Sequence, residues 1–204
     1  MLRKASGSSS NATSTNPLGG ESDDTLDGGA GDDDLLGGDG NDALAGGGGN
    51  DTLNGGYGDD ELDGSGGSTR VFFARDDGHD TVVDADGEAA IDTLVLDADV
   101  RSDMVRLLRE GADLRVDIDG GGNSVLYLGW FDDDTTGVDR IELLDPDGLA
   151  LVWNRADIAA RIVVAFGTDG DDVVVLDDGA NAFDALAGND RVEGRGGADT
   201  LFGG

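Results

Sequence analysis

The stretch GGESDDTLD GGAGDDDLL GGDGNDALA GGGGNDTLN GGYGDDELD, residues 19–63, repeats one pattern every nine residues. Each unit opens with two glycines and has aspartate at its sixth position and leucine at its eighth position. The sixth positions are Asp24, Asp33, Asp42, Asp51 and Asp60, and the eighth positions are Leu26, Leu35, Leu44, Leu53 and Leu62. A fixed period of this kind predicts stacked units, because one unit cannot bury its apolar side chain alone.

The composition of one unit predicts how the stack is built. Its first six residues favour a turn and its last three can extend, so the leucine faces away from its two neighbours. Glycine suits turn positions with positive φ and leaves room for close stacking. We therefore predict an all-β fold, a parallel β-roll in which two units make one 18-residue turn with a strand on each side.

A second, weaker array of the same period occupies residues 167–204. It reads GTDGDDVVV, LDDGANAFD, ALAGNDRVE and GRGGADTLF. The sixth positions are Asp172, Asn181, Asp190 and Asp199, and the eighth positions are Val174, Phe183, Val192 and Leu201. The second array keeps the nonapeptide phase although many of its glycines are replaced.

The remaining residues divide the chain further. Residues 1–18 are rich in Ser, Thr and Asn and are predicted to be a disordered tail, followed by the first roll at 19–67. Residues 68–166 form an intervening β-rich segment, because the alternation in 114–118 and 125–128 predicts half-buried strands. Gly111 and the glycines at 120–122 predict turns, and residues 157–160 predict a short helical turn.

The overall charge restricts the kinds of partner. Lys and Arg total 13 against 45 Asp and Glu, a formal net charge of -32. Such charge disfavours a compact state unless counter-ions are part of the fold, and it argues against nucleic acid and anionic membranes as partners. The chain has no Cys and one His, His79, which excludes thiolate and multi-His zinc sites. No apolar run is long enough for a membrane span, and no nucleophile with a base is evident, so we expect no enzyme.

The aspartates themselves predict a cation. In the predicted roll, Asp24, Asp42 and Asp60 line one edge, while Asp33 and Asp51 line the other. Carboxylates in such columns repel one another unless a cation lies between them. Calcium suits this position, because it takes six to eight oxygens from carboxylates and backbone carbonyls, whereas magnesium demands near-ideal octahedral geometry.

The repeat units resemble the RTX, or haemolysin-type, calcium-binding nonapeptide repeat. The resemblance implies three inter-turn calcium ions in the first array, between Asp24 and Asp42, Asp33 and Asp51, and Asp42 and Asp60. It also implies ligands among the turn carbonyls, namely those of Gly29, Gly31, Gly38, Gly40, Gly47 and Gly49. In the second array it implies one pair of Asp172 with Asp190 and a weaker pair of Asn181 with Asp199.

The middle segment resembles the haemolysin-type calcium-binding protein related domain that lies between RTX arrays. The residues that carry this resemblance are Phe73 and those at 77–82, 92–94, 129–131, 140–142 and 147–148. The resemblance implies no activity. Residues 78–82 imitate the end of a nonapeptide, so Asp80 is a candidate extra ligand.

These features predict a calcium-induced folding module of a secreted, extracellular bacterial protein without catalytic activity. The family resemblance implies export by type I secretion machinery. Two alternatives stay open: the carrier portion of an RTX toxin or hydrolase whose effector lies elsewhere, and a calcium-dependent adhesive module with a cell-surface or glycan partner.

Overall fold

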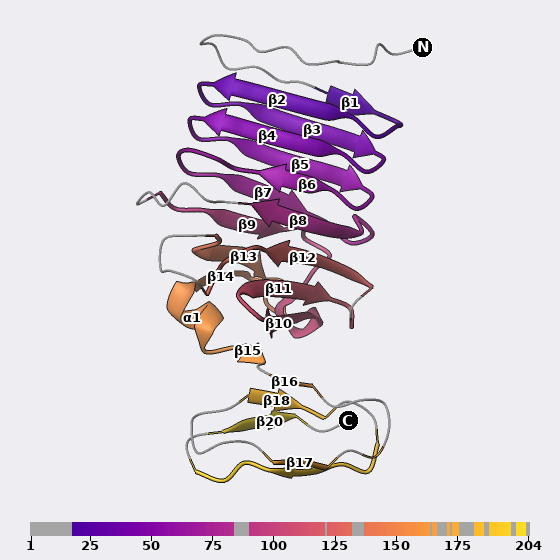
Figure 1. The fold of residues 1–204 in the computed structure, drawn as a ribbon, viewed down its shortest axis with the longest axis vertical. Helices are drawn as coiled ribbons and strands as arrows, with labels where there is room; N and C mark the ends of the chain where they lie inside the picture. The colour runs from indigo at the N-terminus through magenta and orange to yellow at the C-terminus, as the bar shows by residue number, and fades with distance from the viewer. Residues whose placement is uncertain are drawn as a thin grey trace.

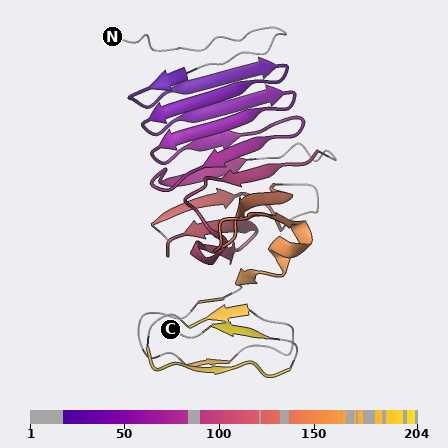
Figure 2. The same ribbon diagram turned by 180° about the vertical axis from the view of Figure 1, so that it is seen from behind.

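The computed structural model describes residues 18–83, 90–120, 122–131, 137–163, 165–166, 171, 173–175, 182–185, 188–196 and 199–202. The predicted tail lies outside these residues except for Leu18, which begins the first strand. The described chain is built of strands, with one short α-helix and one 3-10 turn. Figures 1 and 2 show these strands stacked in turns, which confirms the predicted all-β parallel roll.

The first nine strands form the roll. They are β1 (Leu18–Gly20), β2 (Thr25–Ala30), β3 (Asp34–Asp39), β4 (Ala43–Gly48), β5 (Thr52–Tyr57), β6 (Glu61–Asp63), β7 (Arg70–Phe73), β8 (His79–Val83) and β9 (Thr93–Leu96). Odd-numbered strands pair in parallel in one sheet, and even-numbered strands pair in the other. Leu26 pairs with Leu44 and Leu35 with Leu53, so one turn spans two nonapeptides, as predicted.

The strands of the repeat are longer than the sequence suggested. The strand β2 has six residues and runs through Gly28 and Gly29, so the prediction of a six-residue turn was wrong. Gly28 faces inward beside Leu26, where the absence of a side chain lets the extended backbone pack closely. Gly29 then bends the chain with a φ of +93°. The first glycine of a unit therefore provides space, and the second provides the bend.

Both sheets continue beyond the first array. The other strands of the middle segment are β10 (Val105–Glu110), β11 (Asp113–Ile118), β12 (Asn123–Tyr127), β13 (Arg140–Leu144), β14 (Ala150–Asn154) and β15 (Ile162–Val163). The strand β12 pairs in parallel with β8, and β13 pairs in parallel with β9. Antiparallel pairs β10–β11, β11–β12 and β13–β14 then extend the two sheets. The predicted strands at 114–118 and 125–128 are confirmed; the first begins one residue earlier, and the second begins two residues earlier and ends one residue earlier.

Two short turns interrupt this segment. A 3-10 turn covers Ser102–Met104, and α1 covers Arg155–Ala159. The side chain of Asn154 caps α1 by accepting hydrogen bonds from the backbone N–H groups of Ala156 and Asp157. The predicted helical turn therefore exists, and it begins two residues earlier than expected because Asn154 is the cap.

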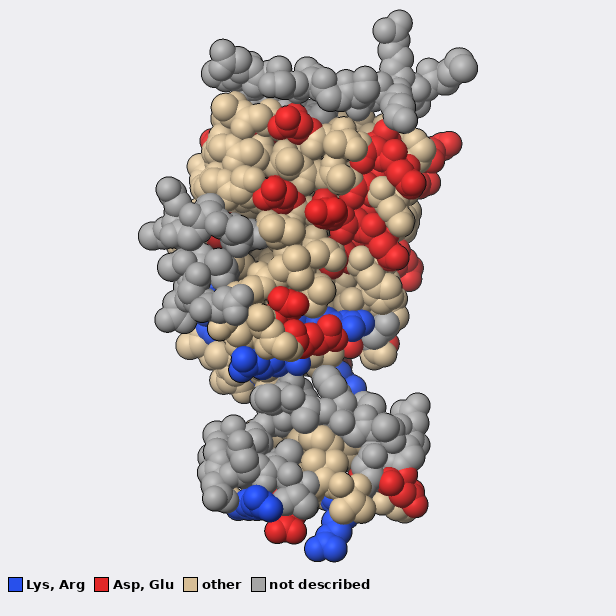
Figure 3. All heavy atoms as spheres, in the orientation of Figure 1, with Lys and Arg blue, Asp and Glu red and all other residues tan. Residues whose placement is uncertain are grey.

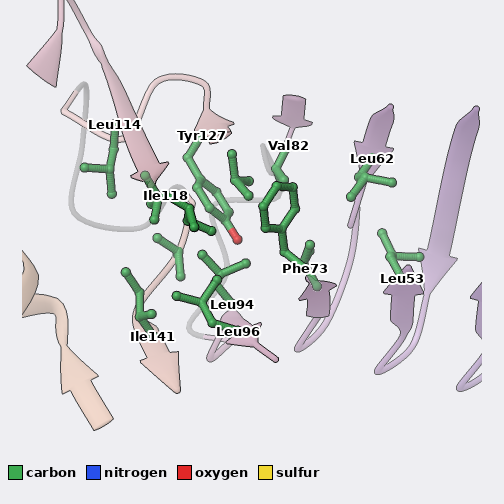
Figure 4. Close-up of a cluster of buried hydrophobic side chains, with 14 of the residues drawn as sticks. Leu53, Leu62, Phe73, Val82, Leu94, Leu96, Leu114, Ile118, Tyr127 and Ile141 are labelled. Carbon is green, nitrogen blue, oxygen red and sulfur yellow. The ribbon is translucent and has the colours of Figure 1, made fainter. Parts of the chain in front are cut away.

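One continuous apolar core runs through the roll and the middle segment. In the first array it is a ladder with one leucine per unit, and Leu53 and Leu62 are fully buried. Figure 4 shows this ladder meeting Phe73 and then the larger side chains around Tyr127 and Ile141. The thin core of the array is therefore closed at one end by the wider core of the middle segment.

The second array forms its own sheets. Its strands are β17 (Val173–Val175), β18 (Ala182–Asp184), β19 (Arg191–Glu193) and β20 (Thr200–Phe202), and β16 (Ala165–Phe166), just before the array, pairs with β18. Val174 pairs with Val192, and Phe183 pairs with Leu201. These partners are eighth-position residues 18 apart, so the degenerate units keep the register of the first array.

Candidate metal sites

The sixth-position aspartates form one column at each edge of the roll. The backbone N–H of Asp24 donates to Oδ1 of Asp42 at 2.7 Å, and that of Asp42 donates to Oδ1 of Asp60 at 2.7 Å. On the other edge the N–H of Asp33 donates to Oδ1 of Asp51 at 2.9 Å. All five side chains are buried, with at most 5% of their surface exposed. The structure thus places each aspartate on the edge that the sequence predicts.

The first-position glycines lie where oxygens from two turns converge. A Cβ on Gly28 would lie 2.6 Å from the carbonyl oxygen of Gly46 and 3.0 Å from Oδ2 of Asp33. The same arrangement recurs at Gly19 and Gly37. Carbonyl and carboxylate oxygens are acceptors, so neither supplies a proton to the other. The absence of a side chain at each of these glycines therefore lets a carbonyl oxygen and a carboxylate oxygen lie close to the same point of the backbone, and such acceptor oxygens favour a cation nearby.

The carboxylates in the columns are incompletely satisfied. Among the described residues, the buried Oδ2 atoms of Asp42, Asp51 and Asp60 receive no hydrogen bond. Burial raises the pKa of each of these carboxyls, and it raises the pKa of Asp60 to about 6. The backbone hydrogen bond to each lowers the pKa, and the preceding aspartate in the column raises it. A buried anion without a counter-charge is unfavourable, and a bound cation would remove that penalty.

The donor set fits calcium. It consists of carboxylate and carbonyl oxygens, which are the hard ligands that calcium takes. Within the part of the chain that the structure describes, no three Asp, Glu, His or Cys side chains converge on one point. Backbone carbonyls must therefore complete the ligand shell of any ion held between Asp42 and Asp60 or between Asp33 and Asp51.

The glycine carbonyls differ in where they lie. Most of the predicted carbonyl ligands lie against the glycine 18 residues later in the chain; this holds for Gly29, Gly31, Gly38 and Gly40. The carbonyl oxygen of Gly47 instead accepts the N–H of Gly66 at 2.8 Å. The oxygen of Gly49 lies against Gly67. The carbonyls that converge with an aspartate Oδ2 belong to first-position glycines such as Gly37 and Gly46, which the sequence reasoning missed. The signal in the sequence that could have identified them is the glycine at the first position of all five units of the first array.

Fifth-position side chains make a parallel, exposed ladder outside the aspartate columns. The N–H of Asn41 donates to Oδ1 of Asp23 at 3.0 Å, and the N–H of Asp59 donates to Oδ1 of Asn41 at 3.1 Å. With the buried columns, this ladder makes the roll strongly acidic. Figure 3 shows acidic side chains gathered over the roll, whereas basic side chains appear farther along the molecule.

The second array is partly described. Oδ2 of Asp199 lies against the first-position Gly194, as in the first array. The N–H of Asn189 donates to Oδ1 of Asp171 at 3.0 Å, which repeats the fifth-position ladder. Asp190 is half-buried. Asp172 and Asn181 lie outside the described residues, so both predicted pairs stay predictions.

Two further units of the roll follow the five evident ones. They comprise residues 64–72, GSGGSTRVF, and residues 75–83, RDDGHDTVV. Ser65 and Asp76 take the second position with φ values of +54° and +74°, where the earlier units have glycine. Thr69 and Asp80 take the sixth position, and Oδ1 of Asp80 accepts the N–H of Asp60 at 3.2 Å. The predicted extra ligand thus lies in the same column as Asp60.

In the described part of the chain, no helix has the length and apolar character that crossing a bilayer requires. A comparison with curated proteins finds no match. Among solved structures, the chain is similar to the crystal structure of extracellular lipase LipA from Serratia marcescens, with 16% identity and a TM-score of 0.25. The match covers 94% of this chain and 29% of the lipase chain. A TM-score this low supports no inference about fold or function.

The family comparison is decisive for the repeats. The family model of the RTX calcium-binding nonapeptide repeat matches in four copies, at residues 18–44, 36–71 and 177–204. The matched residues include both aspartate columns of the first array and the units around Asp190 and Asp199. Residues 18–71 and 177–204 of this chain are therefore RTX calcium-binding nonapeptide repeats.

Proposed function

We propose that this chain is a calcium-responsive, non-catalytic folding module of a secreted bacterial RTX-type protein. The observation that carries the proposal is the buried, unsatisfied Oδ2 of Asp42, Asp51 and Asp60. These carboxylates lie in a stretch with no Lys or Arg between Ala5 and Thr69. The roll therefore has no basic side chain of its own array with which to neutralise its interior.

Calcium supplies the missing charge in this proposal. A ligand that binds only the folded state stabilises it by RT ln(1 + [L]/Kd), about 1.4 kcal/mol per site at ten times Kd. Three sites would contribute about 4 kcal/mol, a large part of the stability of a small domain. Extracellular calcium modules bind at roughly 0.1–1 mM, so the fold would form outside the cell. Export by a type I secretion system belongs to the same proposal and rests on the family match.

Circular dichroism of the whole chain tests the proposal. We expect strand signal in millimolar calcium and its loss in a chelator, with magnesium a poor substitute. Asp42→Asn should weaken the calcium response most, because Asp42 contributes to two of the proposed sites. Asp34→Asn is the matched control, since Asp34 carries the same charge on the exposed face of β3. An equally ordered chain in the chelator would contradict the proposal.

A further inference from the structure

The two aspartate columns end differently where the roll meets the middle segment. On one edge, Thr69 donates its N–H to Oδ1 of Asp92 at 2.7 Å, and Asp92 donates its N–H to Oδ2 of Asp139 at 3.3 Å. Nη1 of Arg155 then donates to Oδ1 of Asp139 at 3.4 Å. The Arg155 guanidinium is itself held 4.5 Å over the ring of Trp130. This column therefore ends on a cation that the chain provides.

The other column ends on Asp80, with which no Lys or Arg in the described part of the chain forms an ion pair; the nearby Arg115 pairs with Asp117 and Glu110. Asp80 is 2% exposed, and its Oδ2 receives no hydrogen bond from any described residue. Burial, together with the charges of Asp60, Asp77 and Asp59, raises the pKa of its carboxyl to about 8, although the hydrogen bond from the Asp60 N–H lowers it. Its partner in the neighbouring strand β12 is Val125, whose side chain is fully buried. The charges that raise the pKa of Asp80 are thus all negative, and its partner in β12 is apolar.

The turn before Asp80 keeps the geometry of a nonapeptide turn without its sequence. Asp76 has a φ of +74°, in the place of a second-position glycine, and Gly78 has a φ of +106°. The carbonyl oxygen of Asp77 accepts the N–H of Gly58 at 2.8 Å, just as Tyr57 accepts the N–H of Gly40 one turn earlier. The Asp77 side chain is 7% exposed, with Oδ2 bound to the N–H of Ala74 at 2.6 Å.

We propose that Asp60 and Asp80 hold an additional divalent cation of calcium's class, in a site that joins the last matched repeats to Asp80, which lies outside the residues that match the repeat family. Backbone carbonyls of the turn at 75–79 would supply the other oxygens, and Asp77 adds negative charge beside them. The site rests on the proposed calcium-dependent function and deepens it. Because Asp80 belongs to β8, which pairs with β12, this ion ties the last turn of the roll to the middle segment.

The experiment compares Asp80→Asn with the parent chain. Asparagine keeps an oxygen for the Asp60 N–H but removes the charge. We expect native mass spectrometry in calcium to show one ion fewer per chain, and thermal unfolding to show a lower midpoint in calcium. In a chelator the variant should be at least as stable as the parent, because a buried charge is gone. A variant that is less stable than the parent in calcium, but not in the chelator, would show that Asp80 contributes to ion binding.

Two controls keep the outcomes distinct. An unchanged ion count with a higher midpoint in calcium would overturn the proposal, because Asp80 would then be a buried, protonated acid. A parent chain that binds no calcium would instead overturn the proposed function. If the variant does not fold, anomalous diffraction from parent crystals grown in calcium decides. A peak between Asp60 and Asp80 is expected, and peaks confined to the matched repeats would overturn the site.

Discussion

The first array and the middle segment share two continuous sheets but balance their charges in different ways. The array has one leucine per unit in its core, and its stretch of the chain has no Lys or Arg from Ala5 to Thr69. The middle segment packs larger side chains such as Trp153 and pairs its acids with arginine. Arg115 lies 2.8 Å from Asp117, and Arg155 lies 3.4 Å from Asp139.

The difference shows that one backbone architecture can be stabilised from two sources. Parallel pairs such as β6–β8 and β8–β12 continue across the boundary without a change of sheet. What changes is the origin of the positive charge, which arginines supply in the middle segment and which, in the proposed function, calcium supplies in the array. Removing the external source should therefore affect the two regions unequally.

The largest expected effect is a regional loss of structure on chelation. Hydrogen–deuterium exchange should show that amides of β2 to β6 lose protection in a chelator, while those of β11 and β13 keep most of theirs. The reason is that the latter strands bury Leu114, Val116 and Ile141 without needing ions. Adding magnesium in place of calcium is the control. Uniform exchange along the chain would show that the two regions form one cooperative unit.

A smaller but local effect should follow from Gly37→Ala. The new Cβ would collide with the carbonyl oxygen of Gly55 and with Oδ2 of Asp42. Overpacking of this kind costs about 1–3 kcal/mol, and here it also displaces proposed ligands, so calcium affinity should fall. Gly122→Ala is the matched control, because nothing lies within 4 Å of its added Cβ. Calorimetric titration measures the affinity, and equal behaviour of the two variants would refute the convergence at Gly37.

The pH dependence of stability should change sign with calcium. Without calcium, the folded-state pKa of Asp60 is about 6 and that of Asp80 about 8, above the unfolded value of 3.8. The folded state then binds more protons, so stability should rise as pH falls from about 8 towards 4. With calcium bound, protonation competes with the ion, and stability should fall over the same range. Urea unfolding at pH 5 and pH 8 checks this, and parallel trends would count against ion binding at these carboxyls.

The smallest effect is expected at a charge pair between the last strands of the roll and the antiparallel pair β13–β14 of the middle segment. Arg70 in β7 lies 2.9 Å from Glu142 in β13, and both side chains are partly exposed. Because exposed pairs contribute little, Arg70→Ala should cost about 1 kcal/mol or less and leave calcium affinity unchanged. A double-mutant cycle with Glu142→Ala isolates the pair. A coupling energy above about 2 kcal/mol would mean that this contact, too, holds these strands together.

The repeat made much of the roll predictable. A period of nine with leucine eighth determines which residues stack, and the aspartate spacing determines that Asp24 and Asp42 share an edge. It does not determine which carbonyls face an aspartate, because spacing carries no information about peptide orientation. The convergence at Gly37 and Gly46 was therefore found only in the structure.

Other features were hidden because they depend on context. The turns at Ser65 and Asp76 adopt positive φ without glycine, so the repeat is hard to see there in sequence. The pairing of β8 with β12 brings together His79 and Ser124, which are 45 residues apart in the chain. No local sequence pattern predicts such a long-range strand pairing. Tertiary packing, rather than local preference, decides these elements.

The side-chain hydrogen bonds along the Asp80 column all point the same way. Each amide of a sixth-position aspartate, in Asp24, Asp42 and Asp60, is received by the carboxylate of the turn nearer the C-terminus. The backbone bonds beside them run the opposite way, because the N–H groups of Ala43, Glu61 and Thr81 donate to the carbonyl oxygens of the same three aspartates. The roll is therefore polar along its axis, and its two ends differ chemically: every turn offers a carboxylate towards the N-terminal side and an aspartate N–H towards the C-terminal side.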